Sequence, residues 1–182
     1  MRVAVTGTPG TGKTTAVEAL VGDERLDRDL EVVHLNDLIR EEGLWNERDE
    51  ERDSLVADLD AVGERLADRA GSEAPGEADL LVESHLAHHL DADRVVVLRC
   101  HPEELERRLL ERGEPEAKAS ENAESEALDV ILSEAVSEHG VENVYEVDTT
   151  DRTPEEVADD IAAVLAGERE PSAGEVDFLD YL

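Results

Sequence analysis

Short apolar runs alternate with stretches of helical periodicity along most of the chain. The runs at residues 80–82 and 95–98 are continuous, which is typical of strands buried on both faces of a sheet. Turn residues and amphipathic stretches separate the runs, as in repeated strand–helix–strand units. The pattern predicts an α/β fold in which helices cover both faces of one parallel sheet. Its strands are expected at residues 2–6, 31–35, 79–83, 94–99 and 143–147.

Helical periodicity fills the intervals between these strands. The last helix has the clearest signals, because Thr153 can serve as its N-cap, Pro154 as its first residue and Glu156 as the partner in a capping box. Its apolar positions recur at helical spacing and form one stripe. Helices are expected at residues 13–21, 54–70, 102–112, 119–139 and 154–166.

Two strongly polar stretches interrupt this order, at residues 36–53 and 111–122. Inserts at such positions in small phosphoryl-transfer folds close over the substrates and exclude water. We interpret them in this way, with ordinary solvated loops as the alternative. Residues 71–78 are expected to form a turn. Residues 167–182 form an acidic tail with an apolar end, which either docks back on the domain or binds a partner.

The composition fits one acidic domain. The chain has 182 residues, and 49 Asp and Glu against 17 Lys and Arg give a net charge of −32. This charge disfavours a nucleic-acid-binding surface and an anionic membrane, because both require cationic side chains. Disorder is the other interpretation of such acidity, but the clear periodicity argues against it. The chain has no apolar stretch of about 20 residues that could span a membrane, and we expect a cytoplasmic protein. Its single cysteine, Cys100, is expected to be a packed, inert thiol.

The choice of basic residues suggests a salt-rich cytoplasm. Only two lysines occur, Lys13 and Lys118, and the other fifteen basic residues are arginines. A surface this acidic repels itself, and concentrated counterions relieve the repulsion. We therefore infer a halophilic source.

This inference predicts that the protein is more stable in concentrated salt. The Debye length falls to about 3 Å near 1 M salt, so the melting temperature should rise between about 0.1 M and about 2 M KCl. Thermal unfolding followed at both concentrations tests this. Equal melting temperatures would exclude the halophilic interpretation.

The most specific motif is Gly-Thr-Pro-Gly-Thr-Gly-Lys-Thr-Thr at residues 7–15, directly after the first predicted strand. It is a complete G-x-x-x-x-G-K-[ST] pattern. Its glycines let the backbone N–H groups surround phosphate oxygens at a helix N-terminus. Lys13 can reach the β- and γ-phosphates, and Thr14 can ligate Mg²⁺. A strand before the motif and a helix after it favour a nucleoside triphosphate site over a glycine-rich turn that binds nothing.

Candidate catalytic residues follow the third predicted strand. Glu83 stands at its end, where an acid beside the first strand would face the phosphate loop and could hold Mg²⁺ directly or through water. His85 could orient a water or accept its proton, or could be a polar residue at the strand end. His88 and His89 raise the question of a metal cluster. The sequence offers no supporting cysteine or second spaced pair, which argues against one.

Phosphoryl transfer also needs cations outside the phosphate loop. Arg40 in the first polar stretch is one candidate, and Arg108, Arg112 and Lys118 around the second are others. Arg108 and Arg112 share a helix face with acidic residues, so an ion-pair ladder is the alternative for them. Lys118 is the more specific candidate, because the only other lysine is that of the phosphate loop. No Asn-Lys-x-Asp segment is present, which disfavours a guanine-specific GTPase.

With these residues in view, the chain resembles the archaeal and eukaryotic nuclear-type adenylate kinases, which also act as ATPases in small ribosomal subunit maturation. The similarity extends to about residue 166. It rests on the phosphate loop and on four further groups of residues: Asp37-Leu38-Ile39-Arg40-Glu41-Glu42, Asp49-Glu50-Glu51, Val82-Glu83-Ser84-His85, and Glu111-Arg112-Gly113 with Lys118, Glu121 and Asn122.

The resemblance implies an adenylate-kinase-like P-loop NTPase with a five-stranded parallel sheet. Residues 1–166 would form the kinase domain, with a monophosphate-binding insert at about 34–57 and a short lid at about 111–121. It implies that Asp37 and Arg40 bind the monophosphate, and that Arg108 and Lys118 belong to the lid region. ATP contacts are implied at Gly10, Gly12, Lys13, Thr14, Thr15, Arg112 and Arg152.

The implied reaction is ATP plus AMP giving two ADP with Mg²⁺, with other monophosphates tolerated. An ATPase activity would accompany release of a small-subunit ribosomal protein. One alternative is a protein that acts chiefly as an assembly-factor ATPase, and another is a kinase for a different small acceptor. Two features depart from the family pattern: Glu83 stands where many relatives carry Asp, and Glu114 follows Gly113 in place of an aromatic residue.

Overall fold

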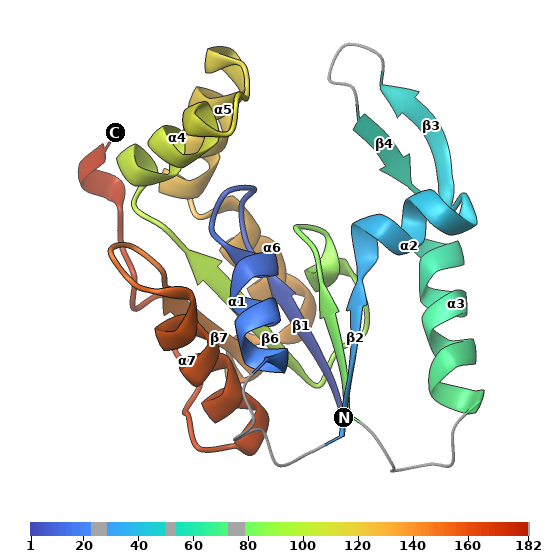
Figure 1. Cartoon of the computed structure of the whole chain (residues 1–182). Coiled ribbons are helices and arrows are strands. Elements are labelled where there is room, and N and C mark those ends of the chain that lie inside the picture. The colour runs from blue at the N-terminus through green and yellow to red at the C-terminus, as the bar shows by residue number, and fades with distance from the viewer. Residues whose placement is uncertain (23–28, 50–53, 73–78, 182) are drawn as a thin grey trace.

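The computed structural model describes residues 1–22, 29–49, 54–72 and 79–181. Five parallel strands form the central sheet in the order β2-β5-β1-β6-β7 (Figure 1). Each strand lies within one residue of its predicted position, so the parallel sheet is confirmed. The strands are β1 (Arg2–Thr6), β2 (Leu30–His34), β5 (Asp79–Glu83), β6 (Arg94–Arg99) and β7 (Val144–Asp148).

Side chains of the sheet alternate between two apolar layers. Val3 and Val5 of β1 belong to one layer and Ala4 to the other, as expected where successive side chains of a strand point to opposite faces. Helices α1 (Lys13–Val21) and α7 (Pro154–Ala166) cover the first face, while α3 (Leu59–Ser72) and α6 (Val130–His139) contribute to the second. Both predicted bounds of α1 and of α7 are confirmed, and Thr153 and Glu156 form the predicted capping box.

The segment after β2 is more ordered than its charge suggests. Its helix α2 (Leu35–Glu42) buries three apolar residues at helical spacing, and Gly43 ends it with a φ of 68°. Strands β3 (Trp45–Asp49) and β4 (Ser54–Ala57) then form an antiparallel hairpin.

The helix predicted at 54–70 is therefore wrong over its first residues. Residues 54–57 pair with β3, and the helix begins only after Asp58, whose carboxylate accepts a hydrogen bond from the N–H of Ala61 at 3.1 Å. This cap fixes the start of α3. Residues 50–53 of the polar stretch, and 73–78 of the turn predicted at 71–78, lie outside the described residues.

The second polar stretch lies between two helices. Helix α4 (Pro102–Glu111) ends one residue earlier than predicted, and α5 (Glu116–Ala127) begins within the predicted lid. The continuous helix predicted at 119–139 is wrong, because the chain breaks between α5 and α6 at Asp129, whose φ is 53°. A left-handed residue cannot continue a helix. In Figure 1 the α4–α5 pair and the β3–β4 hairpin stand on opposite sides of the sheet, beyond the carboxyl ends of its strands.

The acidic tail docks back on the domain, which is one of the two alternatives expected from the sequence. Ser172 Oγ accepts a hydrogen bond from the N–H of Glu146 at 3.0 Å, and the N–H of Ser172 binds the carbonyl of Val144 at 3.1 Å. Phe178 is buried and packs its ring edge-on against His101. The chain also forms short 3₁₀ turns, which are η1 (Ala87–His89), η2 (Val141–Asn143) and η3 (Leu179–Tyr181). Within the described ranges, no helix is both long and apolar enough for a membrane span.

Candidate nucleotide-binding site

The phosphate loop packs so closely that two of its positions require glycine. A Cβ atom on Gly7 would lie 2.4 Å from the carbonyl oxygen of Leu98, and one on Gly10 would lie 2.8 Å from Leu105 Cδ1. Both residues also have positive φ, 140° and 98°, which disfavours any side chain. The loop therefore owes its conformation to its own glycines and to contacts with β6 and α4.

Lys13 is the buried cation of this loop. Its ammonium donates hydrogen bonds to the carbonyls of Gly7 at 2.8 Å and Thr8 at 3.0 Å. Burial lowers the pKa of Lys13 to about 8, against the opposing effect of the Glu83 and Glu126 carboxylates. A partly desolvated ammonium interacts strongly with phosphate oxygens.

Thr14, in the first turn of α1, contacts Glu83 at the carboxyl end of β5. The structure confirms that β5 is the strand beside β1, with Glu83 opposite Val5. The Thr14 hydroxyl donates to Glu83 Oε1 at 3.3 Å, and Glu83 Oε2 lies 2.9 Å from His34 Nδ1. A hydroxyl beside a buried carboxylate supplies the hard oxygen ligands that Mg²⁺ prefers. The residues present therefore fit a magnesium ion.

His85 lies near these groups with an unengaged ring. Within the described ranges, the imidazole makes no hydrogen bond or ion pair, and only the carbonyl of His85 is bonded, by Thr6 Oγ1 at 3.3 Å. Burial, together with the positive charge of Lys13, lowers the pKa of His85 to about 4. The ring is therefore neutral near pH 7 and can accept a proton or orient a water.

Two cations of the predicted lid lie close enough to this region to act on its charges. Arg112 caps the end of α4 through its backbone N–H. Its exposed side chain has no partner among the residues described, and its charge lowers the pKa of Lys13. Lys118 pairs with Glu114 at 2.9 Å, and its charge lowers the pKa of His85. Both side chains are exposed and could bind phosphate in place of their present contacts.

The other predicted cations are already paired. Arg40 lies 3.8 Å from Asp37 on the exposed face of α2. Arg108 pairs with Glu104 at 2.8 Å and also donates to the carbonyl of Thr149 at 3.1 Å. The sequence-based alternative of an ion-pair ladder is realised on α4, with Arg107 rather than Arg112 joining Arg108.

Arg152 is likewise tied into the fold. It binds Asp160 at 2.7 Å and the carbonyls of Glu156 at 2.8 Å and Asp148 at 3.2 Å. These contacts hold the turn between β7 and α7. The side chain therefore lies at the carboxyl end of β7, on the same edge of the sheet as the phosphate loop.

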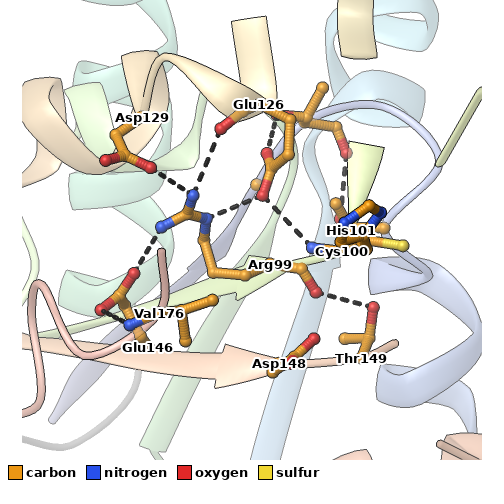
Figure 2. Close-up of polar contacts among 12 residues, drawn as sticks. Arg99, Cys100, His101, Glu126, Asp129, Glu146, Asp148, Thr149 and Val176 are labelled. Atoms are coloured by element: carbon orange, nitrogen blue, oxygen red, sulfur yellow. Dashed lines mark hydrogen bonds and ion pairs between the residues drawn. The ribbon is translucent and has the colours of Figure 1, made fainter. Parts of the chain in front are cut away.

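A buried charge cluster behind the phosphate loop was not foreseen from the sequence. Arg99, at the end of β6, is 1% exposed and forms ion pairs with Glu126 at 2.7 Å, with Glu146, and with Asp129 (Figure 2). Burial alone would lower the pKa of Arg99, but the surrounding carboxylates outweigh it and raise the pKa. The guanidinium also lies 5.4 Å from the ring centroid of Phe178 in the tail.

Glu126 connects this cluster to the phosphate loop. One of its oxygens accepts a hydrogen bond from the Thr8 hydroxyl, and the other binds Arg99 and, at 3.2 Å, the N–H of Cys100. Glu146 in turn accepts N–H bonds from Glu175 at 2.8 Å and Val176 at 3.3 Å. The cluster thus joins the phosphate loop, α5, β7 and the tail. Burial raises the pKa of the adjacent Cys100 thiol to about 11, in agreement with the predicted inert thiol.

The fold and the phosphate loop together define a P-loop NTPase. A family model described as an AAA domain matches residues 3–129, which is more than half of the chain.

Similar proteins extend over the full length. A protein of Natronomonas pharaonis named "Putative adenylate kinase" is 64% identical over 182 residues and covers 100% of both chains. A protein of the same name from Halobacterium salinarum is 58% identical over 183 residues and covers 100% of both chains. Another from Methanosarcina acetivorans is 42% identical over 190 residues, which cover 99% of this chain and 98% of the relative. The chain belongs to this AAA-domain family of archaeal proteins.

Proposed function

We propose that the protein is a nucleoside monophosphate kinase that transfers the γ-phosphoryl group of ATP to AMP and produces two ADP. The observation that carries the proposal is the meeting of Lys13, Thr14 and Glu83 at one edge of the sheet, with Arg112 close by. The name shared by the relatives supports the same activity.

Each part of the site then has a distinct task. The phosphate loop from Gly10 to Thr15, with Lys13, binds the phosphates of ATP. Thr14 and Glu83 would hold Mg²⁺, which neutralises the phosphate oxygens when it is bound. Arg112 and Lys118 approach from the lid at about 111–121, where Arg108 fixes α4 to Thr149.

The acceptor would be held by the insert at about 34–57. Asp37 and Arg40 lie on the exposed side of α2, and an arginine there favours an anionic acceptor over a neutral sugar or vitamin. On the ATP side of the site, Arg152 would contact the nucleotide near its adenine, from the turn after β7. Domain 1–166 would thus bind both substrates, and the tail would stabilise it through its contacts with Glu146.

A panel of phosphate acceptors tests this proposal. ATP consumption should be measured in about 2 M KCl with ATP alone, with ATP and each of several nucleoside monophosphates, and with ATP and neutral sugars. The proposal predicts strong stimulation by AMP and none by neutral acceptors. Stimulation by a neutral acceptor alone would instead identify another kind of small-molecule kinase.

We infer ATP hydrolysis as a second activity, supported by the neutral, unengaged ring of His85. If His85 orients a water, His85→Ala should lower hydrolysis by about 10-fold or more and transfer to AMP by much less, because AMP replaces that water. The two rates should be measured on the same preparation. Equal losses in both rates would argue against this role.

Participation in maturation of the small ribosomal subunit is a further proposal. It rests on the family resemblance and on the acidic surface, whose charge of −32 would steer a basic ribosomal protein toward the enzyme. Concentrated salt screens such steering. Binding of a basic small-subunit protein should therefore weaken sharply as KCl is raised, and salt-independent binding would require an apolar interface instead.

A further inference from the structure

A cluster of histidines and glutamates lies outside the nucleotide site, where η1 packs against α6. His88 and His89 belong to η1, and Glu134 belongs to α6. One donor atom from each of these three residues lies within 4.8 Å of the other two. A second glutamate of α6, Glu138, lies 2.6 Å from His89 Nδ1. The sequence showed the histidines but could not show the acids, because α6 is brought to them only by the fold.

The ring of His88 is held in one orientation. It is 1% exposed, and its Nδ1 lies 2.9 Å from the hydroxyl of Thr6. The same hydroxyl lies 3.3 Å from the carbonyl of His85. Both ring nitrogens of His88 thus have a partner, Thr6 at Nδ1 and Glu134 at Nε2.

The Nε2 atom of His88 faces a carboxylate. His88 Nε2 lies 3.1 Å from Glu134 Oε2. An ionised carboxylate only accepts hydrogen bonds, so a proton on Nε2 or another cation must lie between the two atoms. The cation can be a proton on His88 or a metal ion that takes both atoms as ligands.

The second histidine, His89, packs beside the first and has a glutamate partner of its own. The rings of His88 and His89 are 4.0 Å apart between centroids and tilted by 43°. Glu138 engages Nδ1 of His89, and the ring contributes one ligand atom to the cluster. His139 donates from Nε2 to the carbonyl of His88 at 2.6 Å and so fixes the backbone of η1. In metal sites, partners of this kind hold the ligating imidazoles in place.

We propose that His88, His89 and Glu134 bind a divalent transition-metal ion of the zinc type, with Glu138 orienting His89. Two imidazoles and one carboxylate are ligands that Zn²⁺ accepts, and a water can complete a four-coordinate site. Mg²⁺ is a poor match, because it prefers oxygen ligands. The ion would fasten η1, which follows the strand end bearing Glu83 and His85, to α6. Its task would be structural, because its ligands come from η1 and from α6 and would join these two elements.

Metal binding to the chelator-stripped protein tests the proposal. Equilibrium dialysis against Zn²⁺ in about 2 M KCl suppresses non-specific binding to the acidic surface. One equivalent should bind to the unchanged protein. Binding should weaken by at least about 10-fold in His89→Ala and in Glu134→Gln, both of which alter partly exposed side chains. Co²⁺ should give the visible absorption of a four-coordinate site with nitrogen ligands, and both substitutions should abolish it.

Two matched controls lie outside the cluster. His101→Ala removes a histidine and Glu142→Gln an acid, and both should bind Zn²⁺ like the unchanged protein. Zn²⁺ should also raise the melting temperature of the unchanged protein and of both controls, but not of the two cluster variants. Equal zinc affinity in the unchanged protein and in Glu134→Gln would overturn the proposal. A cobalt spectrum typical of six oxygen ligands would overturn it as well.

Discussion

Lys13→Ala should abolish both phosphoryl transfer to AMP and ATP hydrolysis, with a loss in kcat of at least about 100-fold. Removal of one preorganised donor to transition-state charge typically costs this much. Both reactions require the same neutralisation of the γ-phosphate, so both rates should fall together. Steady-state kinetics with ATP alone and with ATP plus AMP provide the measurement.

The fold should survive this substitution. Burial already lowers the pKa of Lys13 to about 8, which means that the folded state penalises the charged amine. The Lys13→Ala protein should therefore melt no earlier than the unchanged protein at pH 7. Arg107→Ala, which removes an exposed cation of α4, is the matched control and should keep full activity. Retained turnover in Lys13→Ala would exclude the proposed site.

The largest loss of stability is expected from Arg99→Leu. This change leaves the buried carboxylates of Glu126 and Glu146 without their cation. Removal of one partner from a buried ion pair typically costs about 3–5 kcal/mol. Because Glu126 also holds the Thr8 hydroxyl, the phosphate loop should loosen and ATP should bind more weakly. Urea unfolding at constant high KCl gives the free energy of unfolding.

Two further variants show whether the loss of stability comes from the unpaired buried charges or from the loss of an arginine side chain as such. Neutralising both acids in Arg99→Leu/Glu126→Gln/Glu146→Gln should recover part of the lost stability, because no unpaired charge then remains buried. Arg107→Leu breaks an exposed ion-pair ladder and should cost less than about 1 kcal/mol. If Arg99→Leu cost no more than Arg107→Leu, the buried cluster would not be a stabilising element.

Local sequence was sufficient for the sheet and for the phosphate loop. Strands such as 80–82 and 95–98 are apolar because both of their faces are covered, and the glycines of the loop are required by contacts with Leu98 and Leu105. The position of Glu83 beside Thr14 was predictable as well, since it follows from the pairing of β5 with β1. The strands and the phosphate loop depend on residues that lie close together in the sequence. The position of Glu83 depends only on the order of the strands in the sheet.

Contacts between distant segments escaped prediction. Thr8 and Glu126 are 118 positions apart, and among 49 acidic residues nothing local marks Glu126 or Glu146 as buried. The same contacts explain an error in the predicted helices. Asp129 accepts a hydrogen bond from Arg99 and adopts a left-handed conformation, so a break occurs where the sequence alone favours a continuous helix. The strand at 54–57 was missed because its partner, β3, is made mostly of charged residues.

The central claim is that the γ-phosphoryl group passes from the phosphate loop to a nucleotide held by the insert after β2. Its most direct test uses ATP labelled at the γ-phosphorus, Mg²⁺ and saturating unlabelled AMP, with the products separated by chromatography. The account predicts that the label appears in ADP at its β-position, and that Lys13→Ala forms no labelled ADP above background. Label recovered only as inorganic phosphate, even with saturating AMP, would contradict it.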